Sequence, residues 1–193
     1  MKRVQVKDEF KQYMARMRSY IGGRDPLKMQ AAYPGKLKRA VRGLKKAQLK
    51  RRPRPKKWSI QEILGHLADT EVVYGWRLRM MLAQPGQAIQ AYDQDIWAAK
   101  LGYKRQPAGK LLEQVRVLRE SNLRLLKAVP RAWWNRYGMH SERGKETVGR
   151  TVVLLAGHDV NHLNQIAQAE SGRALDRNRH AAVITEKSYD FHY

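Results

Sequence analysis

The sequence predicts an all-α fold, a four-helix bundle that carries a basic N-terminal extension. Long segments place apolar residues at intervals of three and four, which is the spacing of an amphipathic helix. No segment alternates apolar and polar residues as a half-buried strand does. A chain of 193 residues, 42% of them hydrophobic, is long enough for one globular domain and its core.

Two helical segments are expected before residue 58. The first runs from about residue 6 to 21 and ends at Gly22 and Gly23. The second runs from about residue 34 to 49 and ends before Pro53. A four-helix bundle needs only one of them, so the other should be peripheral.

The next helix has a clear start. Ser59 can cap it while Glu62, three residues on, reaches back to the cap, which is the pattern of a capping box. The helix should end before Pro85, and a short helix is expected around residues 95–101 in the connector that follows.

Two further long helices complete the bundle. One should span residues 108–128 and end at Pro130, and the last should span about 147–171 and end at Gly172. Residues 173–193 resemble an irregular tail. We therefore expect a single domain over residues 1–193, with an N-terminal helix in 1–23, a core in about 24–172 and a tail in 173–193.

Positive charge is concentrated near the N-terminus. The chain has a formal charge of +22, and residues 36–57 hold twelve Lys and Arg and no acid. Such a segment attracts phosphates, so binding of nucleic acid is one interpretation. The interpretation we favour is the solvated face of an amphipathic helix, because Tyr33 and Trp58 only flank the segment and no aromatic residue lies within it.

Several classes of chemistry are excluded. The chain has no cysteine, which rules out disulfides, Cys-ligated zinc, iron–sulfur clusters and a thiol nucleophile. It also lacks a His-Glu-x-x-His motif, a pair of Glu-x-x-His motifs, Gly-rich phosphate loops and a Gly-x-Ser-x-Gly elbow. No signal-peptide core or membrane span is recognisable, so we expect a soluble, cytoplasmic protein.

The histidines are the strongest functional signal. His158 and His162 are four residues apart and belong to the apolar stripe of the last helix, while His66 borders the apolar face of the helix after Ser59. If these helices pack together, three imidazoles can meet at one divalent ion and leave a position open, as in catalytic sites. Alternatively, each is a buried histidine bonded to Asp69, Asn161 or Gln165.

Neighbouring residues add to this interpretation. Gly65 and Gly157 precede two of the histidines in mid-helix, where glycine is unfavourable, and a close approach of the two helices would explain them. The other histidines are weaker candidates. His140 is expected in a loop beside Glu142, from where it could support a metal ligand, and His180 and His192 are expected to be solvated in the tail.

Two segments, WSIQEILGHLADTE at residues 58–71 and ETVGRTVVLLAGHDVNHLNQI at 146–166, resemble the signature segments of the DinB-like superfamily. The segments GRDPL at 23–27 and HSERGKETV at 140–148 follow in family order, so the resemblance covers about residues 24–170. It implies an up-down-down-up four-helix bundle, frequently a homodimer, with one divalent ion on His66, His158 and His162. The chain departs from the family in having Asn161 where a further histidine is common, and in its basic segment.

The resemblance also implies an activity. Characterised members are mostly transferases and isomerases that use a low-molecular-weight thiol, so we expect transfer of such a thiol to an electrophilic small molecule. Zinc is the favoured ion, although three imidazoles suit nickel and iron as well. The expected supporting residues are Asp69 and Gln165, which would orient imidazoles, and Tyr74, Arg77 and Trp97, which would line the pocket, with Arg77 as a clamp for a carboxylate.

Two alternatives remain open. The same ion could activate water for hydrolysis, with Asp69 better placed around the helix than Glu71 to serve as a base. Otherwise the chain could be a non-enzymatic basic bundle that binds nucleic acid or an acidic partner and uses a metal only for stability.

Overall fold

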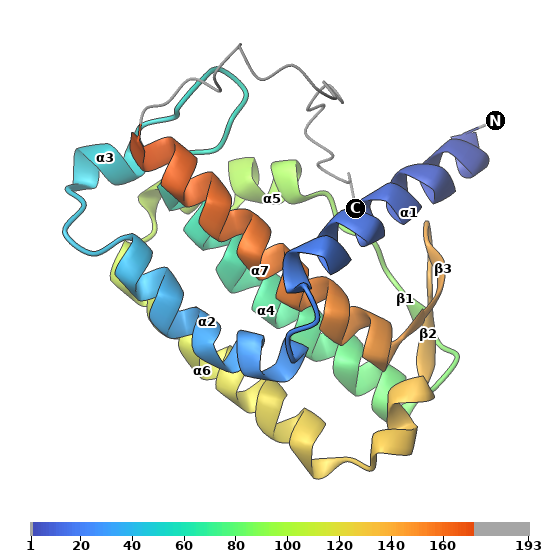
Figure 1. Cartoon of the computed structure of the whole chain (residues 1–193). Helices are drawn as coiled ribbons and strands as arrows, with labels where there is room; N and C mark the ends of the chain where they lie inside the picture. Colours follow the sequence, from blue (N-terminus) through green and yellow to red (C-terminus); the bar gives the residue numbers. More distant parts are fainter. Residues whose placement is uncertain (1, 172–193) are drawn as a thin grey trace.

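The computed structural model describes residues 2–171, which form seven α-helices, two short 3₁₀ helices and three short strands. Four of the helices form the bundle, namely α2 (Pro26–Ala40), α4 (Ile60–Ala83), α6 (Ala108–Ala128) and α7 (Val148–Ser171) (Figure 1). The all-α prediction is confirmed. The expected tail, the stop at Gly172, and His180 and His192 lie outside the described residues.

The bundle has the expected up-down-down-up order. The amide of Gln114 donates to the carbonyl of Ala68, and Arg119 bonds Glu71, so α4 and α6 run in the same direction. Parallel neighbours need a long connection. Residues 84–107 supply it and contain β1 (Ala88–Ile89), α5 (Gln94–Lys100) and the 3₁₀ helix η1 (Tyr103–Arg105).

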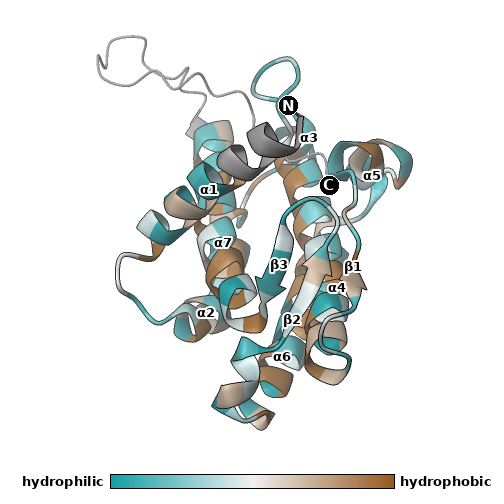
Figure 2. Ribbon diagram, turned by 90° about the vertical axis from the view of Figure 1, so that its right-hand side faces the viewer, coloured by the Kyte–Doolittle hydropathy of each residue, from teal (hydrophilic) through white to brown (hydrophobic). Residues whose placement is uncertain are grey.

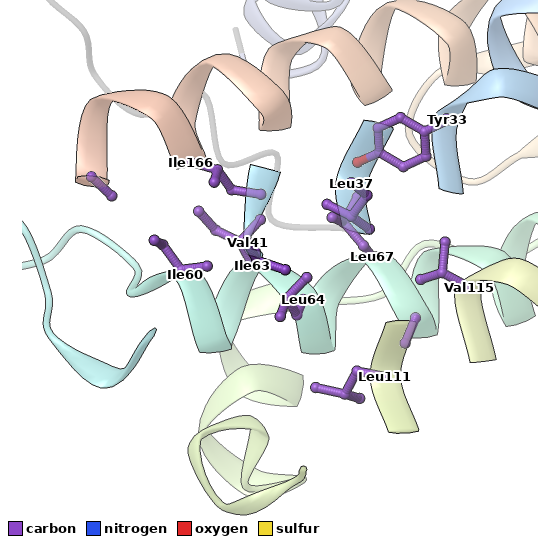
Figure 3. Packing of buried hydrophobic residues seen from close by; sticks show 12 residues of the cluster. Tyr33, Leu37, Val41, Ile60, Ile63, Leu64, Leu67, Leu111, Val115 and Ile166 are labelled. Carbon is purple, nitrogen blue, oxygen red and sulfur yellow. The ribbon is translucent and has the colours of Figure 1, made fainter. Parts of the chain in front are cut away.

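The core lies between α2, α4, α6 and α7. Leu37, Leu64 and Ile166 are fully buried, and Figure 3 shows them among the side chains that the four helices contribute. Burying an aliphatic side chain of this size stabilises the fold by roughly 1.5–3 kcal/mol. This cluster fixes how α4 and α7 face each other.

The capping box at Ser59 is confirmed. The Ser59 hydroxyl accepts from the amide of Glu62, and a Glu62 carboxylate oxygen accepts from the amide of Ser59 at 2.8 Å. The helix it starts, α4, ends at Ala83 as expected, and α5, α6 and α7 also lie within one residue of their expected bounds.

The expected helix over residues 34–49 is wrong. Asp25 accepts from the amides of Leu27 and Lys28 and starts α2 at Pro26, and α2 ends at Ala40 before the short α3 (Lys46–Lys50). Pro34 therefore lies inside α2.

A proline within a helix has no N–H to give to the carbonyl four residues earlier. That carbonyl, of Gln30, accepts from the Arg119 guanidinium at 3.2 Å instead. The missing helix bond is thus replaced by a tertiary one, which ties α2 to α6.

The first helical segment is the peripheral one. It forms α1 (Lys2–Ile21), which lies along α7 outside the four-helix core (Figure 1). Met17 of α1 is fully buried against the bundle. Gly22 and Gly23, both with positive φ, then turn the chain toward α2.

A small sheet, absent from the prediction, closes one side of the molecule. In it β2 (Tyr137–His140) pairs antiparallel with β3 (Gly144–Thr147) and parallel with β1. The 3₁₀ helix η2 (Arg131–Asn135) precedes it. Figure 2 shows β3 on the α7 side and β1 on the α4 side. Strands of two to four residues are too short to produce an alternating pattern.

Among the described helices, none combines the length and the apolar character that crossing a bilayer requires.

Candidate metal centre

Three histidines meet between α4 and α7. The Nε2 atom of His158 lies 3.1 Å from Nε2 of His66 and 3.0 Å from Nε2 of His162. All three side chains are buried, with His66 on the second turn of α4 and the other two one turn apart on α7. The structure therefore brings together the three residues that the sequence singled out.

The three imidazoles are electrically neutral near pH 7. Burial lowers the pKa of His66 and of His158 well below the ordinary value, and it lowers the pKa of His162 to about 4. A neutral imidazole has one nitrogen with a free lone pair. Three such nitrogens are thus available in one small volume.

This arrangement fits a metal ion. Tetrahedral coordination at about 2.1 Å places ligand nitrogens roughly 3.4 Å apart, which is close to the separations found here. The Gln165 side-chain oxygen accepts from Nδ1 of His162 at 2.9 Å, so the lone pair of that ring lies on Nε2 and points to the other rings. The donor set suits zinc, nickel and iron.

Trp58 is a site residue that the sequence analysis missed. Its indole ring lies 5.0 Å from the ring of His66, and its Nε1 donates to Asp95 of α5 at 3.0 Å. Trp58 directly precedes the helix cap, where an apolar residue commonly packs back onto the first turns. That signal predicts packing on α4 but not contact with a histidine.

Asp69 has a different partner from the one expected. Its carboxylate accepts from the Tyr103 hydroxyl at 2.6 Å, and no bond joins it to an imidazole among the described residues. Tyr103 reaches this position because Gly65 has no side chain, since a Cβ there would lie 2.7 Å from the Cβ of Tyr103. The expected orienting role of Asp69 is therefore wrong for this structure.

The explanation offered for the two glycines is also wrong. Gly65 makes room for Tyr103, whereas a Cβ on Gly157 would lie 2.7 Å from the Cα of Met17. The close approaches are therefore those of η1 to α4 and of α1 to α7, rather than of α4 to α7.

A cavity of about 50 Å³ reaches His158, one of the three histidines. Thr70, Tyr74 and Arg77 line it from α4. That Tyr74 and Arg77 line a substrate pocket stays a prediction. Trp97 is not among the described residues that line this cavity. Its ring instead lies 4.5 Å from that of Tyr92, because α5 sits outside the bundle.

His140 is not in a loop but in β2, and it is buried. Its Nδ1 accepts from the amides of Glu142 and Arg143 at 3.2 and 3.4 Å. Burial and the charges of Arg143 and Arg77 lower its pKa to about 2. His140 thus stabilises the turn of the hairpin.

A buried charge network lies directly behind the histidines. The Arg119 guanidinium donates to Glu71 at 2.5 Å and to Asp159 at 2.6 Å, and all three side chains are almost fully buried. Asp159 follows His158 in the chain, so the network ties α7 to α4 and α6 at the level of the site. The bonds from Arg119 also engage the Glu71 carboxylate.

This chain is similar to known proteins in sequence and, for one solved structure, in fold. The family model of the DinB superfamily matches residues 32–166. A protein of Oceanobacillus iheyensis named "Putative metal-dependent hydrolase" is 27% identical over 133 residues, which cover 69% of this chain and 77% of the relative. YfiT of Bacillus subtilis, named in the same way, is 26% identical over 137 residues, which cover 70% and 76%. The solved structure of YfiT, a four-helix bundle of unusual topology, matches with a TM-score of 0.72 at 22% identity and covers 76% of this chain and 84% of YfiT.

Proposed function

This chain belongs to the DinB superfamily, and from that premise we propose that it is a divalent-metal-dependent enzyme whose ion is held by His66, His158 and His162. The observation that carries the proposal is the convergence of three buried, neutral imidazoles, with Nε2 separations of 3.0 and 3.1 Å. The names of the similar proteins from Oceanobacillus iheyensis and Bacillus subtilis support metal dependence.

Each protein group has a definite part in this proposal. The three Nε2 atoms hold the ion, Gln165 fixes the ring of His162, and the indole of Trp58 covers His66. When bound, the ion supplies Lewis-acid chemistry that lowers the pKa of a small nucleophile. Zinc is the ion we favour, and nickel or iron would occupy the same donors.

For the reaction, we propose transfer of a low-molecular-weight thiol to an electrophilic small molecule. The chain has no cysteine, so the thiol comes from solution. Both carboxylates that follow His66 on α4 are engaged, Asp69 by Tyr103 and Glu71 by Arg119. A thiol with a lowered pKa needs no carboxylate base, whereas attack by water gains more from one.

Hydrolysis at the same histidines is the second candidate. Its support is the name that the similar proteins carry, which specifies hydrolases. The two candidates use the same ion and differ in the nucleophile.

The first test is metal content measured by mass spectrometry on the purified protein. We expect one divalent ion per chain, its loss in His158→Ala, and its retention in the control His140→Gln, which changes a buried histidine outside the triad. A folded protein that binds no divalent ion would overturn both candidates.

The second test separates them. Metal-loaded protein is incubated with an aromatic electrophile, with and without millimolar thiol, and with a nitrophenyl ester. Thiol consumption that requires the ion supports transfer. Ester cleavage that needs the ion but no thiol supports hydrolysis and contradicts transfer.

A further inference from the structure

The buried charge network behind the histidines is not electrically balanced. It has one guanidinium, of Arg119, and two carboxylates, of Glu71 and Asp159, so one negative charge is in excess. Each of the three side chains is at most 4% exposed. In the part of the chain that the structure describes, no second cation contacts either carboxylate. A net charge in such a place is costly unless an opposite charge lies nearby.

The hydrogen bonds of the network indicate that both carboxyl groups are ionised. The Arg119 guanidinium donates two N–H groups to Glu71 and two to Asp159. Its fifth N–H goes to the carbonyl of Gln30. Both oxygens of Asp159 accept from Arg119, and the second oxygen of Glu71 accepts from the Asn122 amide at 3.3 Å. Each of the four oxygens is thus an acceptor, which is the pattern of ionised carboxylates.

The network lies beside the three histidines. Asp159 follows His158 in α7, and Glu71 comes five residues after His66, which is about 7.5 Å along α4. After burial and the other histidines, the charge of Arg119 is a further cause of the lowered pKa of His158. The imidazoles are neutral near pH 7, so they do not balance the excess negative charge. A divalent ion between them would balance it.

We propose that Glu71, Arg119 and Asp159 form the counter-charge of the metal site, and that their one excess negative charge raises its affinity for a divalent ion. This role rests on the proposed function, since it requires an ion at the histidines. The three residues act through their charge and not as ligands. Without them, a divalent ion on neutral imidazoles would leave two positive charges in a buried site. With them one remains, which suits a nucleophile that binds as a monoanion, such as a thiolate.

The variant Glu71→Gln tests this role. Oε1 of Glu71 receives both bonds from Arg119, so a glutamine oxygen can keep them while the excess charge disappears. Zinc affinity is measured by competition with a fluorescent chelator at about pH 8, because burial raises the pKa of Asp159 to about 7. We expect zinc to bind at least about tenfold more weakly than to the wild type. A unit charge within roughly 10 Å of a divalent ion has at least this effect in a protein interior.

Two comparisons separate the effect of charge from damage to the structure. Glu120→Gln on α6 removes the same charge from a side chain that is 57% exposed, so solvent screens it and zinc affinity should stay within about twofold of the wild type. In the zinc-free protein, Glu71→Gln removes an unbalanced buried charge and keeps the pair of Arg119 with Asp159. Its midpoint of urea unfolding should therefore be no lower than that of the wild type. A purely structural role of the Glu71 carboxylate would lower that midpoint.

Three results would overturn the counter-charge. The first is equal zinc affinity of Glu71→Gln and the wild type, and the second is an equal loss of affinity in Glu120→Gln. The third is a zinc-free Glu71→Gln protein that does not fold or unfolds at a lower urea concentration, since the carboxylate is then needed by the fold itself. A folded wild-type protein that binds no zinc or other divalent ion would refute the proposed function as well, whereas zinc binding that is unchanged in Glu71→Gln refutes the counter-charge alone.

Discussion

At the scale of single residues, Arg119 carries the largest predicted effect on stability. It is the one cation that contacts Glu71 and Asp159 among the described residues, and its side chain is 2% exposed. Replacing it by methionine leaves two buried carboxylates without a cation, so we expect Arg119→Met to lower the free energy of unfolding by about 3–5 kcal/mol. Urea unfolding measures this change.

Arg116→Met on the same helix is the matched control. The Arg116 side chain is 52% exposed and pairs with exposed Glu113 and Glu120. Its loss should change stability by less than about 1 kcal/mol. Equal effects of the two substitutions would show that the buried network contributes nothing beyond its packing.

Glu62 predicts a dependence of stability on pH. Burial alone would raise the pKa of this carboxyl, but hydrogen bonds from Arg52 and Ser59 lower it from 4.5 to about 2. A carboxyl whose pKa is lower in the folded state stabilises the fold above its unfolded pKa, and this contribution is lost as the pH falls. The wild-type protein should therefore lose stability between pH 4.5 and 2 more steeply than Glu62→Gln. Parallel unfolding curves over that range would contradict the prediction.

At the scale of elements, the contact of α1 with α7 depends on Gly157. A Cβ at this position would overlap the main chain of Met17, so Gly157→Ala must push α1 away from α7. We expect a loss of about 1–3 kcal/mol in unfolding experiments, as for other overpacked sites. Gly109→Ala is the control, because open space surrounds Gly109 on α6. The free energy of unfolding of this variant should equal that of the wild type or exceed it by up to about 1 kcal/mol. A Gly157→Ala variant as stable as wild type would show that α1 is held loosely.

Helices with local start and stop signals could be predicted from the sequence. Ser59 and Glu62 gave the start of α4, and Pro130 gave the end of α6. The break between α2 and α3 could not be predicted in this way, because the apolar spacing continues past Val41 while the chain turns at Gly43 with positive φ. Tolerance of Pro34 inside α2 depends on Arg119, which is 85 residues away in the sequence (119 − 34).

In the candidate site too, some features could be predicted from local sequence patterns and others depend on distant residues. The spacing of His158 and His162 and the apolar stripe around them predicted their common direction. The contact of Trp58 with His66, the pairing of Asp69 with Tyr103 and the bonding of Glu71 to Arg119 depend on which distant elements meet. The periodicity of residues along one helix does not show which other elements that helix contacts.

At the scale of the whole molecule, the basic segment bears on the non-enzymatic alternative, binding of nucleic acid. Residues 36–57 carry mainly exposed cations on the end of α2, on α3 and on the loop that leads to α4. The two flanking aromatic residues are not available for stacking on bases, because Tyr33 is 2% exposed and the Trp58 ring packs against His66. Attraction of phosphates by charge alone is therefore the only contribution we expect from this segment.

Such attraction has a clear dependence on salt. We expect the protein to bind a labelled single-stranded oligonucleotide at low ionic strength and to lose roughly a thousandfold or more in affinity between about 50 and 200 mM salt, as for a protein with many phosphate contacts. Fluorescence anisotropy measures the effect. His66→Ala should leave the curve unchanged, because the histidine is buried and carries no charge near pH 7. Binding that persists at about 150 mM salt and distinguishes one sequence from another would contradict this prediction and favour a nucleic-acid function, since counterion release alone gives neither property.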